Sequence, residues 1–542
     1  MDQWLSILWT FLLSGTAFWH SPEPPASIPF ETTSQLYLVS FTEKKQTTFC
    51  PETELDHKAI VRRQRNGLPE WDWFDLPVTP GYIESIDKQV DTLRHILRWF
   101  NAVSVKARPY QLANIARLPF VKEIKPLYGQ AILSQKGLSG PDEQNQRLDT
   151  LLSLVRNLMH LDSLEKAGLT GQGVRIAIFD AGFKDTDVHP SLTHVRSRNG
   201  IVGTKDFYDG DDNVYHHSTH GMRVMSCIGG IYQGRQLGAA RDAEFLLARI
   251  EHERKELRVE EDHWMAAAEW ADRMGADIIN SSVTYTSARY TIEQMDGLTT
   301  PVSKAAKIAT DKGMLVVVSM GNDGDKSWRF MGAPADVPQV LSVGGSLPML
   351  QQHIRFASVG PNARGLLKPD VAAPGFVLSA IRKDKFGEIA GTSFSSPLIA
   401  GIAACLLQKQ PNRSNRDLFH DVRELGHFYP YYDYELGYGV PDMRKLSVAD
   451  SSFVPDTLFS VKFTIDSVFV LFDSLKLRQD TSRFPNGRLF YYHLERTPGL
   501  LSTYHETRLP SASLRYAIPK SPGARGTFRI WMEGYLFEQK LY

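Results

Sequence analysis

The stretch VRIAIFDAG at residues 174–182 decides how the middle of this chain folds. Its first six residues are almost all apolar or β-branched, which predicts a buried strand, and the Ala-Gly pair after Asp180 predicts a turn. Asp180 therefore stands at the carboxyl end of a strand, where open α/β sheets bind their ligands. Taken alone, an aspartate in this position is also typical of a turn or helix cap.

Strand patterns like this one alternate with helical patterns from about residue 150 to residue 447. Further strands are predicted at 244–250, 277–283 and 314–318, and helices at 259–274, 302–311 and 398–408. Because β-branched runs separated by helices are typical of a parallel sheet buried on both faces, we expect an α/β domain over residues 150–447.

The strongest chemical signal is IAGTSFSSP at residues 389–397, which opens an apolar helix. The backbone N–H groups at such a helix start would surround Ser393, and the helix dipole favours negative charge there. An ordinary N-cap serine is the alternative interpretation. Position 395 is Ser, so the stretch is not G-x-S-x-G, which disfavours a nucleophile elbow of the α/β-hydrolase type.

Two further polar residues stand beside glycines at predicted turns. His220 precedes Gly221 at a helix start and could act as a general base. With His216 and His217 it could instead ligate a metal, although the group has no Glu and is not the HExxH zinc signature. Asn322 follows a strand and a glycine, so its amide could donate to an oxyanion or simply occupy a turn.

In the order Asp180, His220, Asn322 and Ser393, these residues resemble the active site of the subtilisin-like serine proteases, whose triad order is Asp, His, Ser. The resemblance covers roughly residues 150–447 and includes GAARDA at 238–243, KPDVAAPG at 368–375 and GYGVPD at 437–442. It implies a doubly wound, mostly parallel sheet. It also implies that Ser393 is the nucleophile, His220 the base and Asp180 its orienting group, with Asn322 and the Ser393 N–H binding the oxyanion.

The same resemblance implies that Ser282, Val283 and Thr284 bind the substrate backbone as an added strand. The family usually has Thr where this chain has Met222, and Gly where it has Thr284. A pseudoprotease or binding scaffold is therefore an alternative to an active endopeptidase, although all four polar catalytic positions are filled. A sedolisin-type acid peptidase would need a carboxylate in place of His220, and a histidine base predicts a neutral-to-alkaline optimum.

The stretches EEDHWMAAAEWADRMGADIINSS at 260–282 and GTSFSSPLIAGIAACL at 391–406 are similar to secreted subtilases of Bacteroidetes-type bacteria. Residues 1–19 contain an apolar run of 16 residues, Trp4–Trp19. As a helix it would span about 24 Å, short of the roughly 30 Å hydrocarbon core, so we expect a cleaved signal peptide. An uncleaved anchor or a mis-assigned start codon is the alternative. We expect a secreted or cell-surface protein of the bacterial envelope with no membrane-spanning segment in the mature chain.

Residues 30–128 have the pattern of a small α+β unit. Strands are predicted at 35–41, 101–107 and 121–127, and helices at 54–66 and 109–117. YLVSFTEK, WFNAVSVKA and LPFVKEIKPL resemble the inhibitory propeptide of such enzymes. The resemblance implies a zymogen that is cut in the polar linker at 129–149, since exposed linkers are where proteases cut. A permanent accessory domain is the alternative.

Residues 451–542 carry short aromatic or β-branched segments between turn residues, which predicts a small all-β C-terminal domain. It faintly resembles the C-terminal secretion domains of the same bacteria.

Composition excludes some partners. Lys plus Arg and Asp plus Glu each number 61, so a net charge of zero offers no electrostatic case for nucleic acid. The expected partners are protein or peptide substrates and the chain's own propeptide. Cys227 and Cys405 lie in apolar stretches, which predicts buried free thiols, with a disulfide between them as the alternative, and Cys50 is the third cysteine.

No cofactor or metal is needed for the predicted chemistry. Asp206, Asp209, Asp211 and Asp212 could hold a structural calcium ion through oxygen ligands, or form a solvated loop.

Overall fold

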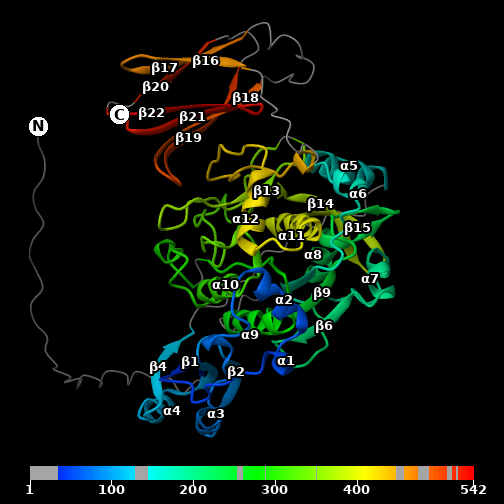
Figure 1. Ribbon diagram of the computed structural model, residues 1–542, viewed down its shortest axis with the longest axis vertical. Coiled ribbons are helices and arrows are strands. Elements are labelled where there is room, and N and C mark those ends of the chain that lie inside the picture. The colour runs from blue at the N-terminus through cyan, green and yellow to red at the C-terminus, as the bar shows by residue number, and fades with distance from the viewer. Residues whose placement is uncertain are drawn as a thin grey trace, which may run out of the picture.

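The computed structural model describes residues 34–127, 145–252, 260–286, 289–349, 351–446, 457–473, 488–509, 515–520 and 523–542. The predicted signal peptide and most of the predicted linker lie outside these residues. Figure 1 shows a small N-terminal unit at one end, a large central domain and a β-rich C-terminal unit at the other end. Within the described part of the chain, no helix has the length and apolar character needed to cross a membrane.

The central domain is built on a parallel sheet of seven described strands in the order β13-β12-β11-β10-β5-β9-β6. These strands are β5 (Arg175–Asp180), β6 (Ile201–Asp206), β9 (Glu244–Arg249), β10 (Ile278–Ser281), β11 (Leu315–Ser319), β12 (Leu341–Ser346) and β13 (Val371–Pro374). The order reverses at β5, so the predicted doubly wound parallel sheet is confirmed. Strands β6, β12 and β13 were not expected, because glycine or alanine interrupts the β-branched run in IVGTKD, LSVGGS and VAAP.

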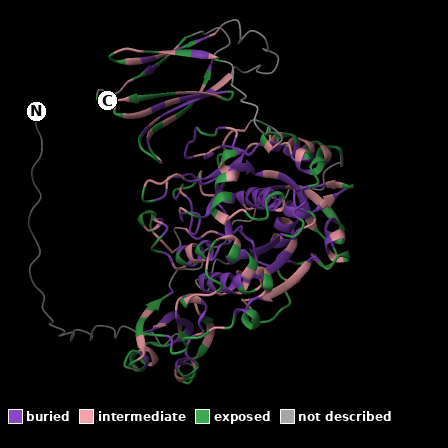
Figure 2. Cartoon of the chain, in the orientation of Figure 1, coloured by how far each residue is buried: buried purple, intermediate pink, exposed green. Residues whose placement is uncertain are grey.

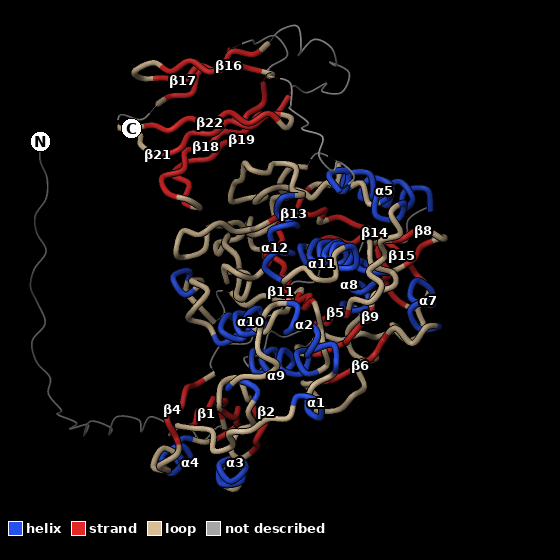
Figure 3. Tube along the Cα trace, in the orientation of Figure 1, coloured by secondary structure: helices blue, strands red, loops and turns tan. Residues whose placement is uncertain are grey.

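Helices cover both faces of the sheet (Figure 3). Ile176 and Ile178 of β5 pack in one core with helices α8 (His220–Gly229) and α11 (Thr392–Lys409). Ala177 and Phe179 pack in the other core with α9 (Glu260–Arg273) and α10 (Pro301–Asp311). This alternation follows from the two-residue period of a strand. Figure 2 shows α11, which runs through the centre of the domain, as almost entirely buried.

The helices of the central domain are α5 (Asn145–Met159), α6 (Asp162–Lys166), α7 (Thr193–Ser197), α8 (His220–Gly229), α9 (Glu260–Arg273), α10 (Pro301–Asp311), α11 (Thr392–Lys409) and α12 (Asn415–Glu424). Its hairpins pair β7 (Ile231–Tyr232) with β8 (Arg235–Gln236), and β14 (Phe376–Arg382) with β15 (Lys385–Ala390). Helix α5 begins inside the predicted linker, because Leu148, Leu151, Leu152 and Val155 recur at helical spacing and are buried in the core.

The N-terminal unit is a four-stranded antiparallel sheet in the order β2-β3-β1-β4 with two crossover helices, a split β-α-β unit. Its elements are β1 (Gln35–Phe41), α3 (Pro80–Asp87), β2 (Thr92–Leu97), β3 (Ala102–Ala107), α4 (Pro109–Ile115) and β4 (Val121–Pro126). The helix expected at 54–66 is present as α2 (His57–Arg65), and a short helix α1 (Pro51–Glu54) precedes it. Helix α2 begins after Asp56, because the Asp56 side chain accepts from Lys58 N and caps it.

The C-terminal unit is all-β, as predicted. One sheet contains β16 (Phe459–Phe463), β17 (Ser467–Phe472) and β20 (Arg515–Pro519), and the other contains β18 (Arg488–Thr497), β19 (Leu500–Leu509), β21 (Gly526–Met532) and β22 (Tyr535–Leu541). Their facing side chains form a core of their own. The unit also packs on the tyrosine-rich stretch of the central domain, where Tyr432 and Tyr434 contact Leu501.

Candidate active site

Asp180 and His220 come together at the carboxyl end of β5. Asp180 is the last residue of the strand and is fully buried, and His220 is the first residue of α8. His220 Nδ1 lies 2.8 Å from Asp180 Oδ1. Because a carboxylate can only accept, Nδ1 carries the proton and Nε2 is left as the acceptor that a general base needs. The predicted pairing of these two residues is therefore present.

Two glycines allow the close approach of the segments that carry this pair. Gly221 N donates to Gly182 O at 2.9 Å, and a Cβ on Gly221 would lie 2.6 Å from that same oxygen. Gly182 has φ of +140° and a Cβ there would meet His216 O at 3.0 Å. The turn after Asp180 and the start of α8 thus pack backbone against backbone, which explains the glycine that follows each catalytic candidate.

Ser393 is the second residue of α11, in the first helical turn, and is half-buried. Among the described residues, its hydroxyl donates to Ser282 O at 3.3 Å rather than to His220. The His220 ring lies 5.4 Å from the ring of Phe394, the residue after Ser393, so His220 and Ser393 lie near one another. Ser282 Oγ in turn donates to Ser393 O at 2.9 Å, which ties α11 to the end of β10.

Asn322 is held with its amide in one orientation. Its Oδ1 accepts from Thr392 N at 3.0 Å and from Thr392 Oγ1 at 3.1 Å. Because the oxygen is engaged, the Nδ2 group is the part of the side chain left to donate, and it lies 3.6 Å from the position of a Cβ on Gly391. An amide fixed beside the residue that begins α11 is suited to stabilise an oxyanion at Ser393.

Thr392 is the residue that the motif analysis missed. Its single hydroxyl proton is shared between Asn322 Oδ1 and Gly321 O, each 3.1 Å away, and the buried hydroxyl oxygen accepts from Gly321 N at 3.2 Å. Thr392 stands directly before Ser393 in the motif at 389–397. Its partner Asn322 is 70 residues away in the sequence, so no local pattern links the two residues.

The two residues that depart from the family pattern, Met222 and Thr284, lie in different parts of the central domain. Met222 belongs to α8 and is fully buried in the core, so its side chain has no solvent-exposed surface. Thr284 is the last residue of the predicted substrate edge Ser282-Val283-Thr284, and its Oγ1 would lie 3.3 Å from a Cβ on Gly321. A glycine at 321 therefore leaves room for the larger residue at 284.

Cations of the protein already pair with three of the four carboxylates in the acidic loop. Arg249 Nη1 donates to Asp206 Oδ2 at 2.7 Å and to Asp209 Oδ2 at 2.6 Å, and Asp212 pairs with Lys205 at 2.9 Å. Asp206 and Asp209 gather with His216 and His217, not with the two other aspartates. With cations of the protein already on these carboxylates, this loop is poorly suited to calcium.

The cysteines are as predicted, with Cys227 and Cys405 buried and unpaired and Cys50 exposed.

The N-terminal unit packs against α9 of the central domain. Glu269 is buried and accepts from Arg98 N and Trp99 N, both at 2.9 Å, and Arg94 Nε pairs with Asp262 Oδ2 at 2.9 Å. Burial raises the pKa of Glu269 to about 7, against the pull of the backbone donors. Sequence reasoning missed this contact, because nothing around Glu269 distinguishes it from an ordinary helix-surface glutamate.

Comparison with family models identifies two matching regions. Residues 171–426 match the Subtilase family, and residues 36–140 match a Peptidase S8 propeptide domain of Bacteroidota. The second match covers the unit predicted to be a propeptide.

Similar proteins include subtilisin BL of Lederbergia lenta, 30% identical over 250 residues that cover 46% of this chain and 81% of that protein. Serine protease AprX of Bacillus subtilis is 25% identical over 323 residues, 54% of this chain and 70% of that protein. The M-protease of Shouchella clausii is also 30% identical, and the chain spans 57% of its length.

Two solved structures are similar in fold. Fervidolysin from Fervidobacterium pennivorans has a TM-score of 0.53 at 17% identity, covering 92% of this chain and 70% of that one. The epidermin leader peptide processing serine protease of Staphylococcus aureus has a TM-score of 0.54 at 16% identity, covering 77% of this chain and all of that one.

Proposed function

Because the chain belongs to the subtilase family, we propose that it is a serine endopeptidase, made as a zymogen, that works with Asp180, His220 and Ser393. The observation that carries this proposal is the 2.8 Å contact between His220 Nδ1 and Asp180 Oδ1 beside the first turn of α11. No cofactor is needed for this chemistry.

In the proposed reaction, His220 Nε2 takes the Ser393 proton while Ser393 Oγ attacks the peptide carbonyl. The proton then goes to the leaving amine, and water resolves the acyl-enzyme by the same route. Asp180 stabilises the imidazolium that forms. Asn322 Nδ2 and the Ser393 N–H donate to the oxyanion, and Ser282, Val283 and Thr284 hold the substrate backbone as an added strand.

The N-terminal unit is proposed to be the inhibitor that is removed on maturation. The family match over residues 36–140 supports this role, as do its buried contacts with α9. The apolar run at 4–19 supports export of the chain, and protein or peptide substrates follow from the reaction.

The test compares the full chain with Ser393→Ala at pH 8, by intact mass and by cleavage of a mixed peptide library. The matched control is Ser395→Ala in the same helical turn, whose hydroxyl is buried against Pro374 O at 3.2 Å. We expect the wild type and Ser395→Ala to lose about 130–150 residues and to cleave peptides, and Ser393→Ala to do neither. A wild type that stays intact, and whose separately prepared 150–447 domain is also inert, would establish a scaffold instead.

A further inference from the structure

One segment of the N-terminal unit takes no part in the unit's own core. Residues 43–75 lie between β1 and α3 and contain α1, α2 and the 3-10 turn η1 (Trp73–Asp75). The core of the unit is formed by side chains from strands β1 and β3 and helices α3 and α4, and includes no residue of 43–75. We call this segment the docking arm. In Figure 1 its helices lie against the central domain, apart from the small sheet.

The arm inserts a fully buried guanidinium into the central domain. Arg62 has no exposed surface; its Nη1 donates to Ala276 O at 2.5 Å and its Nε to Lys312 O at 3.1 Å. Its Nη2 pairs with the buried carboxylate of Asp272. Each of these partners belongs to the central domain, so the cation's hydrogen bonds exist only while the arm is docked.

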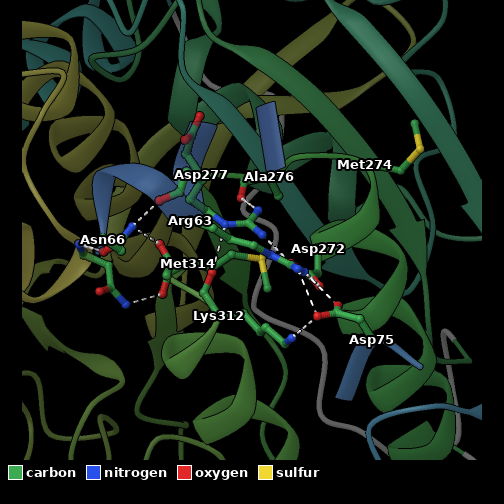
Figure 4. A network of polar contacts seen from close by, with 12 residues as sticks. Arg63, Asn66, Asp75, Asp272, Met274, Ala276, Asp277, Lys312 and Met314 are labelled. Carbon is green, nitrogen blue, oxygen red and sulfur yellow. Dashed lines mark hydrogen bonds and ion pairs between the residues drawn. The ribbon is translucent and has the colours of Figure 1, made fainter. Parts of the chain in front are cut away.

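A second group of charges interlocks across the same boundary (Figure 4). Arg63 of the arm binds Asp75 of the arm at 2.9 and 3.0 Å and Asp272 of the central domain at 2.8 Å. Asp75 also accepts from Lys312 Nζ of the central domain at 2.6 Å. Both signs of charge cross the boundary, and all four side chains are buried. A shared buried network of this kind resists removal of any single member.

The rim of the contact is equally specific. Asn66 Oδ1 accepts from Asn415 N at 2.8 Å while its Nδ2 donates to Gly313 O at 3.3 Å. Arg65 Nη2 pairs with Asp277 Oδ1 at 3.0 Å. Gly313 has φ of +85°, and a Cβ there would lie 2.6 Å from Asn66 Nδ2. The surface of the central domain is thus shaped to the arm.

This surface lies at the opposite edge of the sheet from the active site. Ala276 and Asp277 precede β10, and Lys312 and Gly313 precede β11, whereas the catalytic candidates follow the carboxyl ends of the strands. Strands of four or five residues separate the two edges by about 15 Å. A segment docked here neither needs the cleft nor is cut when the linker is cut.

We propose that the docking arm is a second anchor, independent of the cleft, that keeps the cleaved propeptide on the protease until the arm itself is lost. This inference rests on the proposed function in presupposing that the linker is cut. The arm adds to the contact that the small sheet makes with α9, and separate contacts on one inhibitor raise its retention through effective concentration, because one can re-form while another holds. Cutting the linker would then yield a bound complex rather than free enzyme.

The test uses the full chain with Ser393→Ala and a recognition sequence for a site-specific protease placed within 129–144. External cutting makes the result independent of the chain's own activity, so failure of the proposed function cannot mimic failure of the anchor. The exposed Cys50 carries a fluorophore, and release after cutting and dilution is followed by anisotropy and size exclusion. The variants are Arg62→Ala with Arg63→Ala, and Asn66→Ala at the rim. Lys88→Ala, which removes an exposed pair with Glu84 inside the unit, is the control.

With the arm intact, we expect the cut propeptide to co-elute with the protease. The dissociation rate should rise at least tenfold in Asn66→Ala and about 100-fold in the double variant, and stay unchanged in Lys88→Ala. Thermal unfolding of each uncut chain checks folding, and if the double variant does not fold, Asn66→Ala decides. Rates for the arm variants equal to that of Lys88→Ala, or a propeptide that leaves as soon as the linker is cut, would overturn the proposal.

Discussion

Thr392 should contribute to catalysis by holding the Asn322 amide, and its replacement by valine tests that contribution. Valine keeps the shape of threonine but removes the hydroxyl that donates to Asn322 Oδ1 and bridges Gly321. The Thr392 N–H still bonds Asn322 Oδ1 at 3.0 Å, so the amide loses one of its two ties.

The expected loss in kcat follows from the one hydrogen bond that Thr392→Val removes from Asn322 Oδ1. One neutral hydrogen bond contributes about 0.5–1.5 kcal/mol, which corresponds to a fall in kcat of about 2- to 10-fold. Asn322→Ala removes the proposed oxyanion donor and should lower kcat by about 10²–10³, the loss known for an oxyanion-hole donor in subtilisin. KM should change little in both variants, because the oxyanion exists only in the transition state.

The assay is steady-state hydrolysis of a peptide identified in the library screen, with active sites counted by burst titration. Thr392→Ser keeps the hydroxyl and is the matched control, expected within twofold of the wild type. If Asn322→Ala stays within threefold of the wild type, or if Thr392→Val is as severe as Asn322→Ala, the oxyanion role assigned here is wrong.

Three further outcomes are expected. Burial raises the pKa of both Cys227 and Cys405 to about 12. A disulfide-exchange reagent at pH 8 should therefore label only Cys50 in the folded chain, and three thiols after denaturation. More than one labelled thiol in the folded chain would contradict the structure. The pKa of Glu269 is about 7 in the zymogen and returns toward its usual 4.5 if propeptide release exposes it, so protonation favours the complex. The stabilisation of the complex by protonated Glu269 is complete below about pH 4.5 and is lost as the pH rises to about 7. Over this range the propeptide Kd of the wild type should rise by up to about 10²-fold more than the Kd of Glu269→Gln. Parallel pH profiles of the two Kd values would exclude a role for Glu269 protonation. Asp180→Asn should leave the fold intact but lower kcat by about 10⁴, because an amide can donate to Nδ1 and stabilise the wrong imidazole tautomer; unchanged kcat would remove Asp180 from the mechanism.

Much of the central domain was predictable because its signals are local. The β5 strand is a continuous apolar run, and the polar residues that follow it lie in turns bounded by glycines. Strands such as β12 escaped because their stability comes from burial between neighbours rather than from β-branched side chains. The start of α2 was predicted three residues too early, because helical composition does not show that Asp56 caps the helix.

The sequence by itself determined the alternation of strands and helices, because hydrophobic periodicity depends on neighbouring residues. It also determined the order of the catalytic candidates and the identity of the small N-terminal unit, because both depend on short motifs of neighbouring residues. Only the tertiary structure decided which charges are buried. The stretch HKAIVRRQR has the composition of a solvated helix, yet Arg62 and Arg63 are buried, because Asp272 and Lys312, more than 200 residues away, supply the opposite charge and the carbonyl oxygens that make burial possible. Such complementarity depends on atoms from distant parts of the chain and has no pattern that the local sequence could carry.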